Sequence, residues 1–117
     1  MSLTPSESKV RNAQDALDLV RRQFMDQMEM RIIELETLFQ RCRTAGTTPK
    51  ECREIRDISH KLAGLAPSLG FSKIGNSARI VETLADTAQQ GSGDVTAENP
   101  LFLHLEHLLD VMEASLD

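Results

Sequence analysis

Residues 48–71 read TPKECREIRDISHKLAGLAPSLGF, and this stretch contains a complete set of helix signals. Thr48 can cap a helix N-terminus, Pro49 suits the first helical position, and the glutamate two residues further on can close a capping box. Apolar residues then recur every three or four positions, which predicts an amphipathic helix as far as Leu69, with the next glycine as its C-cap. Pro67 should loosen the last turn, because it cannot donate a hydrogen bond to the carbonyl four residues earlier.

The same helical period continues through most of the chain. One periodic segment covers residues 6–20 and can run on, with or without a break, to residue 44; two more cover residues 71–90 and 100–116. Long amphipathic helices with short connections pack as a bundle. We therefore predict an all-α fold, an antiparallel up-and-down four-helix bundle with a short additional N-terminal helix, residues 6–20, that caps one end.

The core of this bundle should be aliphatic, because aromatic residues make up only 3% of the chain and neither Trp nor Tyr occurs. The apolar stripes of the four long segments supply the following core residues: Phe24, Met28, Ile32, Leu35, Phe39 and Cys42; Ile55, Ile58, Leu62, Leu65 and Leu69; Ile74, Ala78, Val81, Ala85 and Ala88; and Leu101, Leu105, Leu108 and Met112.

The length and charge of the chain limit its organisation and its partners. Its 117 residues suit one domain, residues 1–117, with residues 1–5 as a disordered leader and residues 90–94 as a mobile loop. The formal net charge of −5 argues against nucleic acid or an anionic membrane as the main partner. No apolar run suits a membrane span or a signal peptide, so we expect a cytoplasmic protein in which Cys42 is a buried thiol, not part of a disulfide.

His60 is the residue of greatest chemical interest. In a helical projection the apolar residues of its helix lie ~140–220° away from it, so His60 should point away from the core. A lone exposed histidine is most often just a solvated side chain. Two features of the same face suggest more. Gly64 carries a helix penalty of about 1 kcal/mol relative to Ala, and Arg56 and Arg53 supply positive charge for a phosphoryl group.

The residues around His60 resemble the signature of the histidine phosphotransfer domain family. That pattern has an exposed His, a Leu two residues on, a Gly four on and another Gly ten on, then an apolar and an acidic residue in the next helix. The residues that carry the resemblance are His60, Leu62, Gly64, Gly70, Ile74 and Glu82. One position departs, because the family usually has Lys three residues after the His and this chain has Ala63.

The resemblance implies a function. His60 would accept a phosphoryl group, on Nε2 by family precedent, from an aspartyl phosphate of a receiver domain and pass it to the Asp of another. The partners would be response regulator receiver domains and the receiver domains of hybrid histidine kinases, and the protein would be a monomer. Mg²⁺ is expected on the receiver only, so this chain needs no cofactor or metal of its own. No GxxxxGK or GxGxxG occurs, so we expect no self-phosphorylation from ATP.

The phosphate-stabilising or docking residues are predicted to surround His60. They are Arg56, Lys61, Gly64, Pro67, Ser68 and Arg79. Arg56, Lys61 and Arg79 each offer a cation in place of the missing Lys, and the sequence does not rank them.

Three other interpretations compete with phosphotransfer. The first is a non-catalytic helical-bundle adaptor that binds protein partners, with His60 incidental. The second is a metal held by His104 and His107, which lacks a third ligand in sequence. The third is a hydrolase that uses Ser59 and Asp57, although neighbours on one helix cannot easily form a converging triad.

Overall fold

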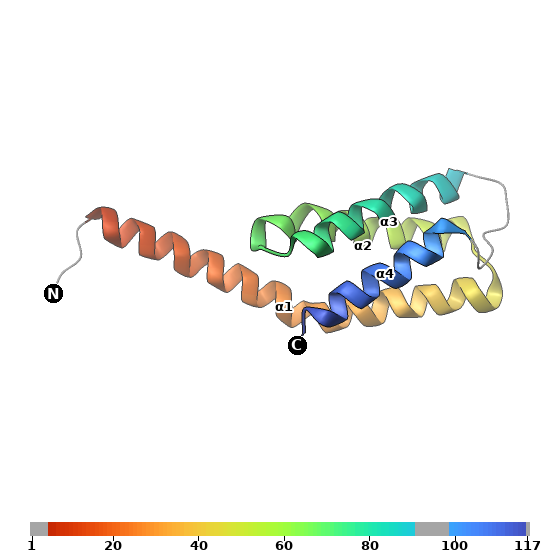
Figure 1. Ribbon diagram of the computed structural model, residues 1–117, viewed down its shortest axis with the longest axis horizontal. Coiled ribbons are helices and arrows are strands. Elements are labelled where there is room, and N and C mark those ends of the chain that lie inside the picture. Colours follow the sequence, from red (N-terminus) through yellow and green to blue (C-terminus); the bar gives the residue numbers. More distant parts are fainter. Residues whose placement is uncertain (1–4, 91–98, 117) are drawn as a thin grey trace.

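The computed structural model describes residues 5–90 and 99–116, and these form four α-helices and one short 3₁₀-helix (Figure 1). The elements are α1 (Pro5–Ala45), α2 (Pro49–Leu65), the 3₁₀-helix η1 (Pro67–Leu69), α3 (Ser72–Gln90) and α4 (Pro100–Ala114). The described residues contain no strand, so the prediction of an all-α fold is confirmed. The expected leader, residues 1–5, and the expected loop, residues 90–94, lie outside the described residues apart from Pro5 and Gln90.

α2 and α4 lie against the C-terminal part of α1, and α3 packs on α2 and α4. In Figure 1 the chain turns back at the end of α1 into α2, turns again into α3, and returns once more through α4. The most extensive packing is between α2 and α3, followed by α3 with α4. The helix that carries His60 is therefore held mainly by α3.

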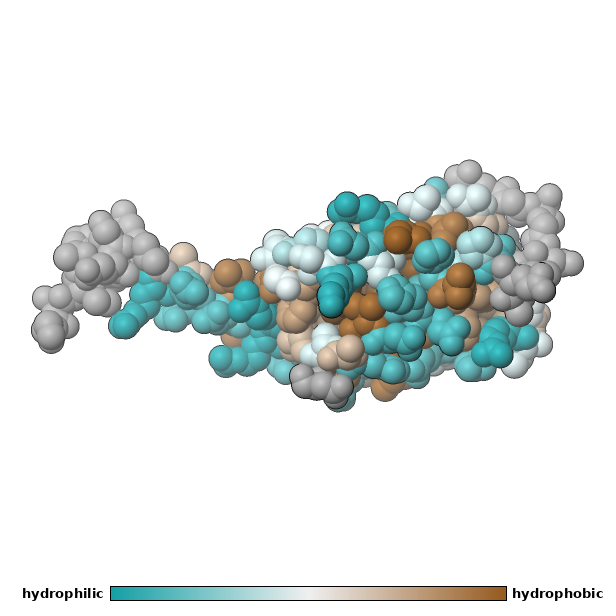
Figure 2. Space-filling view, in the orientation of Figure 1, coloured by the Kyte–Doolittle hydropathy of each residue, from teal (hydrophilic) through white to brown (hydrophobic). Residues whose placement is uncertain are grey.

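The prediction of a separate short N-terminal helix is wrong. α1 is a single helix of 41 residues, and its first part projects beyond the bundle, so the molecule is 65 Å long (Figure 1). Neither glycine nor proline interrupts residues 6–45, and without such a breaker the backbone continues as helix. This segment does not cap the bundle: Leu17, Leu19 and Val20 are 40–52% exposed. Figure 2 shows a mostly hydrophilic surface on its described part.

The core agrees closely with the apolar stripes. Of the predicted core residues only Leu65 is exposed, at 44%, while Phe39, Ile58 and Ala88 are partly buried and the remainder are buried. Leu65 is the last residue of α2 and borders a small hollow next to Phe24 of α1, so its side chain is not covered. Cys42 is buried and free, as predicted, and so is Cys52.

The ends of α2 show why the helix has these bounds. The Thr48 hydroxyl accepts a hydrogen bond from the Glu51 backbone N–H at 3.4 Å, and Pro49 is the first helical residue. The helix was predicted to reach Leu69 but ends at Leu65, because Pro67 starts a 3₁₀ turn instead. Gly70 follows at φ 92°, a left-handed conformation that glycine adopts without strain.

None of the described helices combines the length and the apolar character needed to cross a lipid bilayer.

Candidate functional site

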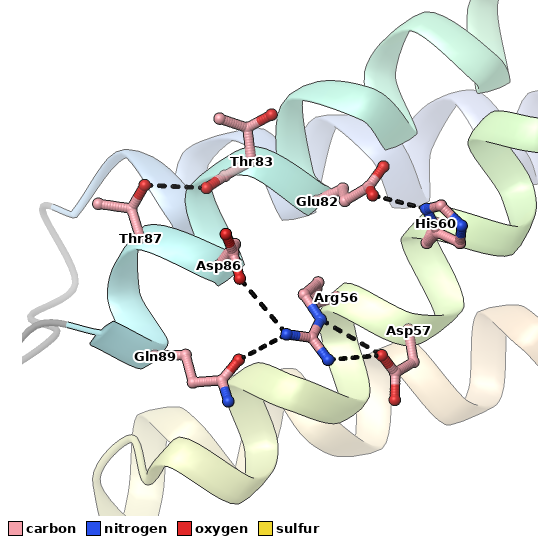
Figure 3. A network of polar contacts seen from close by, with 8 residues as sticks. All are labelled: Arg56, Asp57, His60, Glu82, Thr83, Asp86, Thr87 and Gln89. Carbon is pink, nitrogen blue, oxygen red and sulfur yellow. Dashed lines mark hydrogen bonds and ion pairs between the residues drawn. The ribbon is translucent and has the colours of Figure 1, made fainter.

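His60 lies on the outer face of α2, and 73% of its side chain is exposed. The prediction that it points away from the core is confirmed. One ring nitrogen, Nδ1, lies 2.6 Å from Oε1 of Glu82, which reaches across from α3 (Figure 3). In Figure 3 the other ring nitrogen points away from both Glu82 and Arg56.

This contact determines what the imidazole can do. A carboxylate only accepts hydrogen bonds, so a neutral His60 paired with it must carry its proton on Nδ1. Nε2 then keeps its lone pair and faces away from the carboxylate. A hydrogen bond that fixes one nitrogen thereby leaves the lone pair of the other nitrogen available to act as a nucleophile.

Glu82 contacts His60 directly, whereas the sequence identified it only as a motif position. Its side chain is 28% exposed and is the one polar partner of His60 among the described residues. The signal was present, since an acidic residue twenty-two positions after the His belongs to the pattern. A contact between side chains of two helices depends on the relative position of the helices, and the periodicity of the sequence does not determine that position.

Gly64 lies one turn after His60 and is exposed. A Cβ atom built on it would have no atom within 4 Å, and its φ is not positive. Neither the packing nor the backbone of this molecule therefore requires glycine here. The open backbone beside His60 leaves space for a second molecule.

Arg56 is engaged by carboxylates and an amide. Its Nη1 donates to Asp86 at 3.3 Å and to Gln89 at 3.0 Å, while Nε and Nη2 donate to Asp57 at 3.3 and 3.1 Å (Figure 3). These hydrogen bonds, first to Asp57 and then to Asp86, raise the pKa of the Arg56 guanidinium. All three nitrogens have partners, so Arg56 ties α2 to α3.

The other predicted residues fall on different sides of His60. Lys61 borders hollows between α1 and α2, together with Arg31, on the flank opposite to Glu82. Pro67 packs against Gly75 of α3, and the Ser68 hydroxyl donates to the Leu65 carbonyl at 2.9 Å. Arg79 is exposed on α3.

Two of the competing interpretations gain nothing from the geometry. His107 is exposed and His104 partly buried, and no three potential ligands come together in residues 5–90 and 99–116. Ser59 is fully buried and its hydroxyl has no hydrogen-bond partner, so no substrate can reach it. The exposed and oriented imidazole of His60, beside the open backbone of Gly64, remains as the candidate site.

Comparison with protein families gives a match to the Hpt domain over residues 19–115. The chain belongs to the Hpt domain family. Comparison with curated proteins and with solved structures found no match. Hpt domains carry out phosphotransfer in two-component phosphorelays and interact with receiver domains, so the resemblance read from the His60 motif is confirmed at the level of the family. The match starts within α1 and leaves out most of the segment that projects from the bundle.

Proposed function

We propose that His60 is the phosphoacceptor of this Hpt domain. It takes a phosphoryl group from the aspartyl phosphate of a hybrid histidine kinase receiver domain and passes it to the aspartate of a response regulator receiver. The observation that carries the proposal is the His60–Glu82 contact, which leaves Nε2 of an exposed imidazole as the nucleophile. The helices would serve this role as an antiparallel up-and-down bundle, supported by the regular pairing of α2 with α3.

The chemistry requires little of this chain. The Nε2 lone pair attacks phosphorus, the P–O bond to the receiver aspartate breaks, and the aspartate leaves as a carboxylate. The ring then carries the phosphoryl group on Nε2 and a proton on Nδ1, and is positively charged. In the second transfer an aspartate oxygen attacks the same phosphorus, the P–N bond breaks, and the neutral imidazole is restored.

Glu82 supports both transfers. Its carboxylate accepts the Nδ1 proton in a charge-assisted hydrogen bond and offsets the positive charge that the ring acquires. The ring is therefore oriented before the receiver arrives, which is how positioning lowers the barrier of a transfer with little covalent chemistry. Mg²⁺ and most of the charge neutralisation would come from the receiver.

The docking surface would lie around His60. Gly64 lets the receiver approach the α2 backbone, and Pro67 and Ser68 are exposed further along the same face. Exposed Leu65 adds an apolar contact at the end of α2. That the protein is a cytoplasmic monomer without a cofactor of its own stays a prediction.

The test compares two histidines of the same chain. A receiver domain phosphorylated with acetyl phosphate is mixed with wild type, His60→Gln and His107→Gln, and the label on this chain is followed. We expect His60→Gln to accept no phosphoryl group while keeping its helical circular dichroism, and His107→Gln, altered at an exposed position on α4, to match wild type. Labelling of His60→Gln would contradict the assignment. Receiver binding by wild type without any labelling would favour the adaptor interpretation.

A further inference from the structure

The contacts that α2 and the following η1 make with α3 define a regular register. Pro67 meets Gly75, His60 meets Glu82, and Arg56 meets Asp86. From the first pair to the second, the position moves back seven residues from η1 into α2 and forward seven residues along α3. From the second pair to the third, it moves back four residues along α2 and forward four along α3. Two neighbouring helices that run in opposite directions give this pattern.

The register places Arg79 within one helical turn of the level of His60. Counting three residues back from Glu82 along α3 and three forward from His60 along α2 sets Arg79 level with Ala63. Three helical residues rise roughly 4.5 Å, so Arg79 starts less than one turn from the level of His60, on the side of Gly64. Packed helix axes lie about 8–10 Å apart, a gap that a long arginine side chain can span. Ala63 opposite it is small and leaves the way open.

The negative charges around His60 explain why a cation at the position of Arg79 would stabilise a phosphoryl group. A phosphoryl group would add a charge of roughly −2 next to Glu82, with Asp57 and Asp86 nearby. Arg56 is occupied by its own partners, and Lys61 lies on the α1 flank of α2. Arg79 is exposed, and within the described residues its guanidinium has neither a hydrogen bond nor an ion pair.

We propose that Arg79 binds the phosphoryl oxygens of phosphorylated His60, a role that rests on the phosphotransfer function proposed above. The guanidinium offers two parallel N–H donors to a phosphate, and it reaches the group from α3 while Glu82 holds the far side of the ring. Arg79 thus supplies from the neighbouring helix a cation that α2 does not provide at position 63.

Phosphoramidate tests this role without a receiver. The Nε2 lone pair attacks phosphorus, the P–N bond of phosphoramidate breaks, and ammonia leaves. The variants are Arg79→Gln, Arg79→Lys, Lys61→Gln and, as the matched control, Lys73→Gln, which removes one positive charge from an exposed position of the same helix. The full chain is used, the rate of labelling of His60 is measured at low and high salt, and thermal unfolding is checked for each variant.

We expect Arg79→Gln to label roughly two- to fivefold more slowly at low salt, about the value of one solvent-exposed ion pair, Arg79→Lys to recover part of the rate, and Lys73→Gln to equal wild type. Salt should slow wild type more than Arg79→Gln, because salt screens an attraction that the variant lacks. An Arg79→Gln rate equal to wild type, or a larger loss in Lys61→Gln than in Arg79→Gln, overturns the proposal. If wild type itself takes no label on His60, the proposed phosphotransfer function fails. This result differs from a failure of the Arg79 role alone, in which wild type and Arg79→Gln label equally fast.

Discussion

Gly64 and Gly75 border the same seam between α2 and α3, and their surroundings differ completely. A Cβ on Gly75 would lie 2.4 Å from Cγ of Pro67, so the fold needs this glycine to let η1 approach α3. A Cβ on Gly64 would meet nothing within 4 Å. Gly75 is buried and Gly64 is exposed one turn after His60.

This difference shows that Gly75 is required by the packing of the fold, whereas Gly64 is not. At its Pro67 end the seam is closed, because η1 packs directly on Gly75 of α3. Near His60 it is open on one side, with Glu82 fixing the ring from the other. A helix penalty accepted at Gly64 without any packing reason indicates that a partner, absent from the folded chain itself, uses that space.

Gly64→Leu should separate docking from chemistry most strongly. The leucine side chain would project into the open space where the receiver approaches, so transfer from a phosphorylated receiver should fall by roughly a hundredfold. Labelling by phosphoramidate, a small donor, should fall far less. If receiver transfer stays at the wild-type rate, the space beside Gly64 is not a docking surface.

Gly75→Ala should damage the fold and not the site. The added methyl group overlaps the Pro67 ring, and overpacking of this kind costs about 2 kcal/mol. The melting temperature should drop by roughly 8–15 °C, measured by circular dichroism. Below its melting temperature the variant should still label on His60. An unchanged melting temperature would mean that Pro67 does not pack tightly against Gly75.

Glu82→Gln should slow phosphoryl transfer about tenfold while the melting temperature stays near wild type. The amide can still hydrogen-bond to the ring, but it lacks the charge that offsets the phosphorylated imidazole. Glu106→Gln, an exposed change on α4, is the control for loss of one negative charge. Equal rates for the two variants would remove Glu82 from the mechanism.

Gly64→Ala should give a smaller change in stability than Gly75→Ala, and the change should have the opposite sign. Alanine fits without contact and favours the helix, so stability should rise by about 0.5–1 kcal/mol, or a few degrees in melting temperature. A loss of stability would show that the space beside Gly64 is filled by the fold.

The sequence predicted the parts of this molecule that depend on local rules. The helical period gave the core, and capping rules gave the start of α2 at Pro49. The absence of a break in α1 was left open by the sequence, since exposed apolar residues such as Leu17 continue a stripe whether or not a partner covers them. The outward direction of His60 also follows from projection within one helix.

Relations between helices were not predictable in this way. The partner of His60 on α3, and the capture of Arg56 by Asp86 and Gln89, depend on how two helices are set against each other. The close fit of Pro67 on Gly75 belongs to the same setting, and the sequence pattern does not mark this contact. The ranking of Arg79 above Arg56 and Lys61 likewise became possible only once the register was known.

The position of the phosphoryl group on the protein is the sharpest test of the roles proposed for His60 and Glu82. The full chain is phosphorylated with a phosphorylated receiver domain and examined by heteronuclear NMR that couples phosphorus to the imidazole protons. We expect a single phosphohistidine at residue 60, bonded through Nε2, with Nδ1 still protonated beside Glu82. A phosphoryl group on Nδ1 of His60, or on His104 or His107, would contradict this expectation.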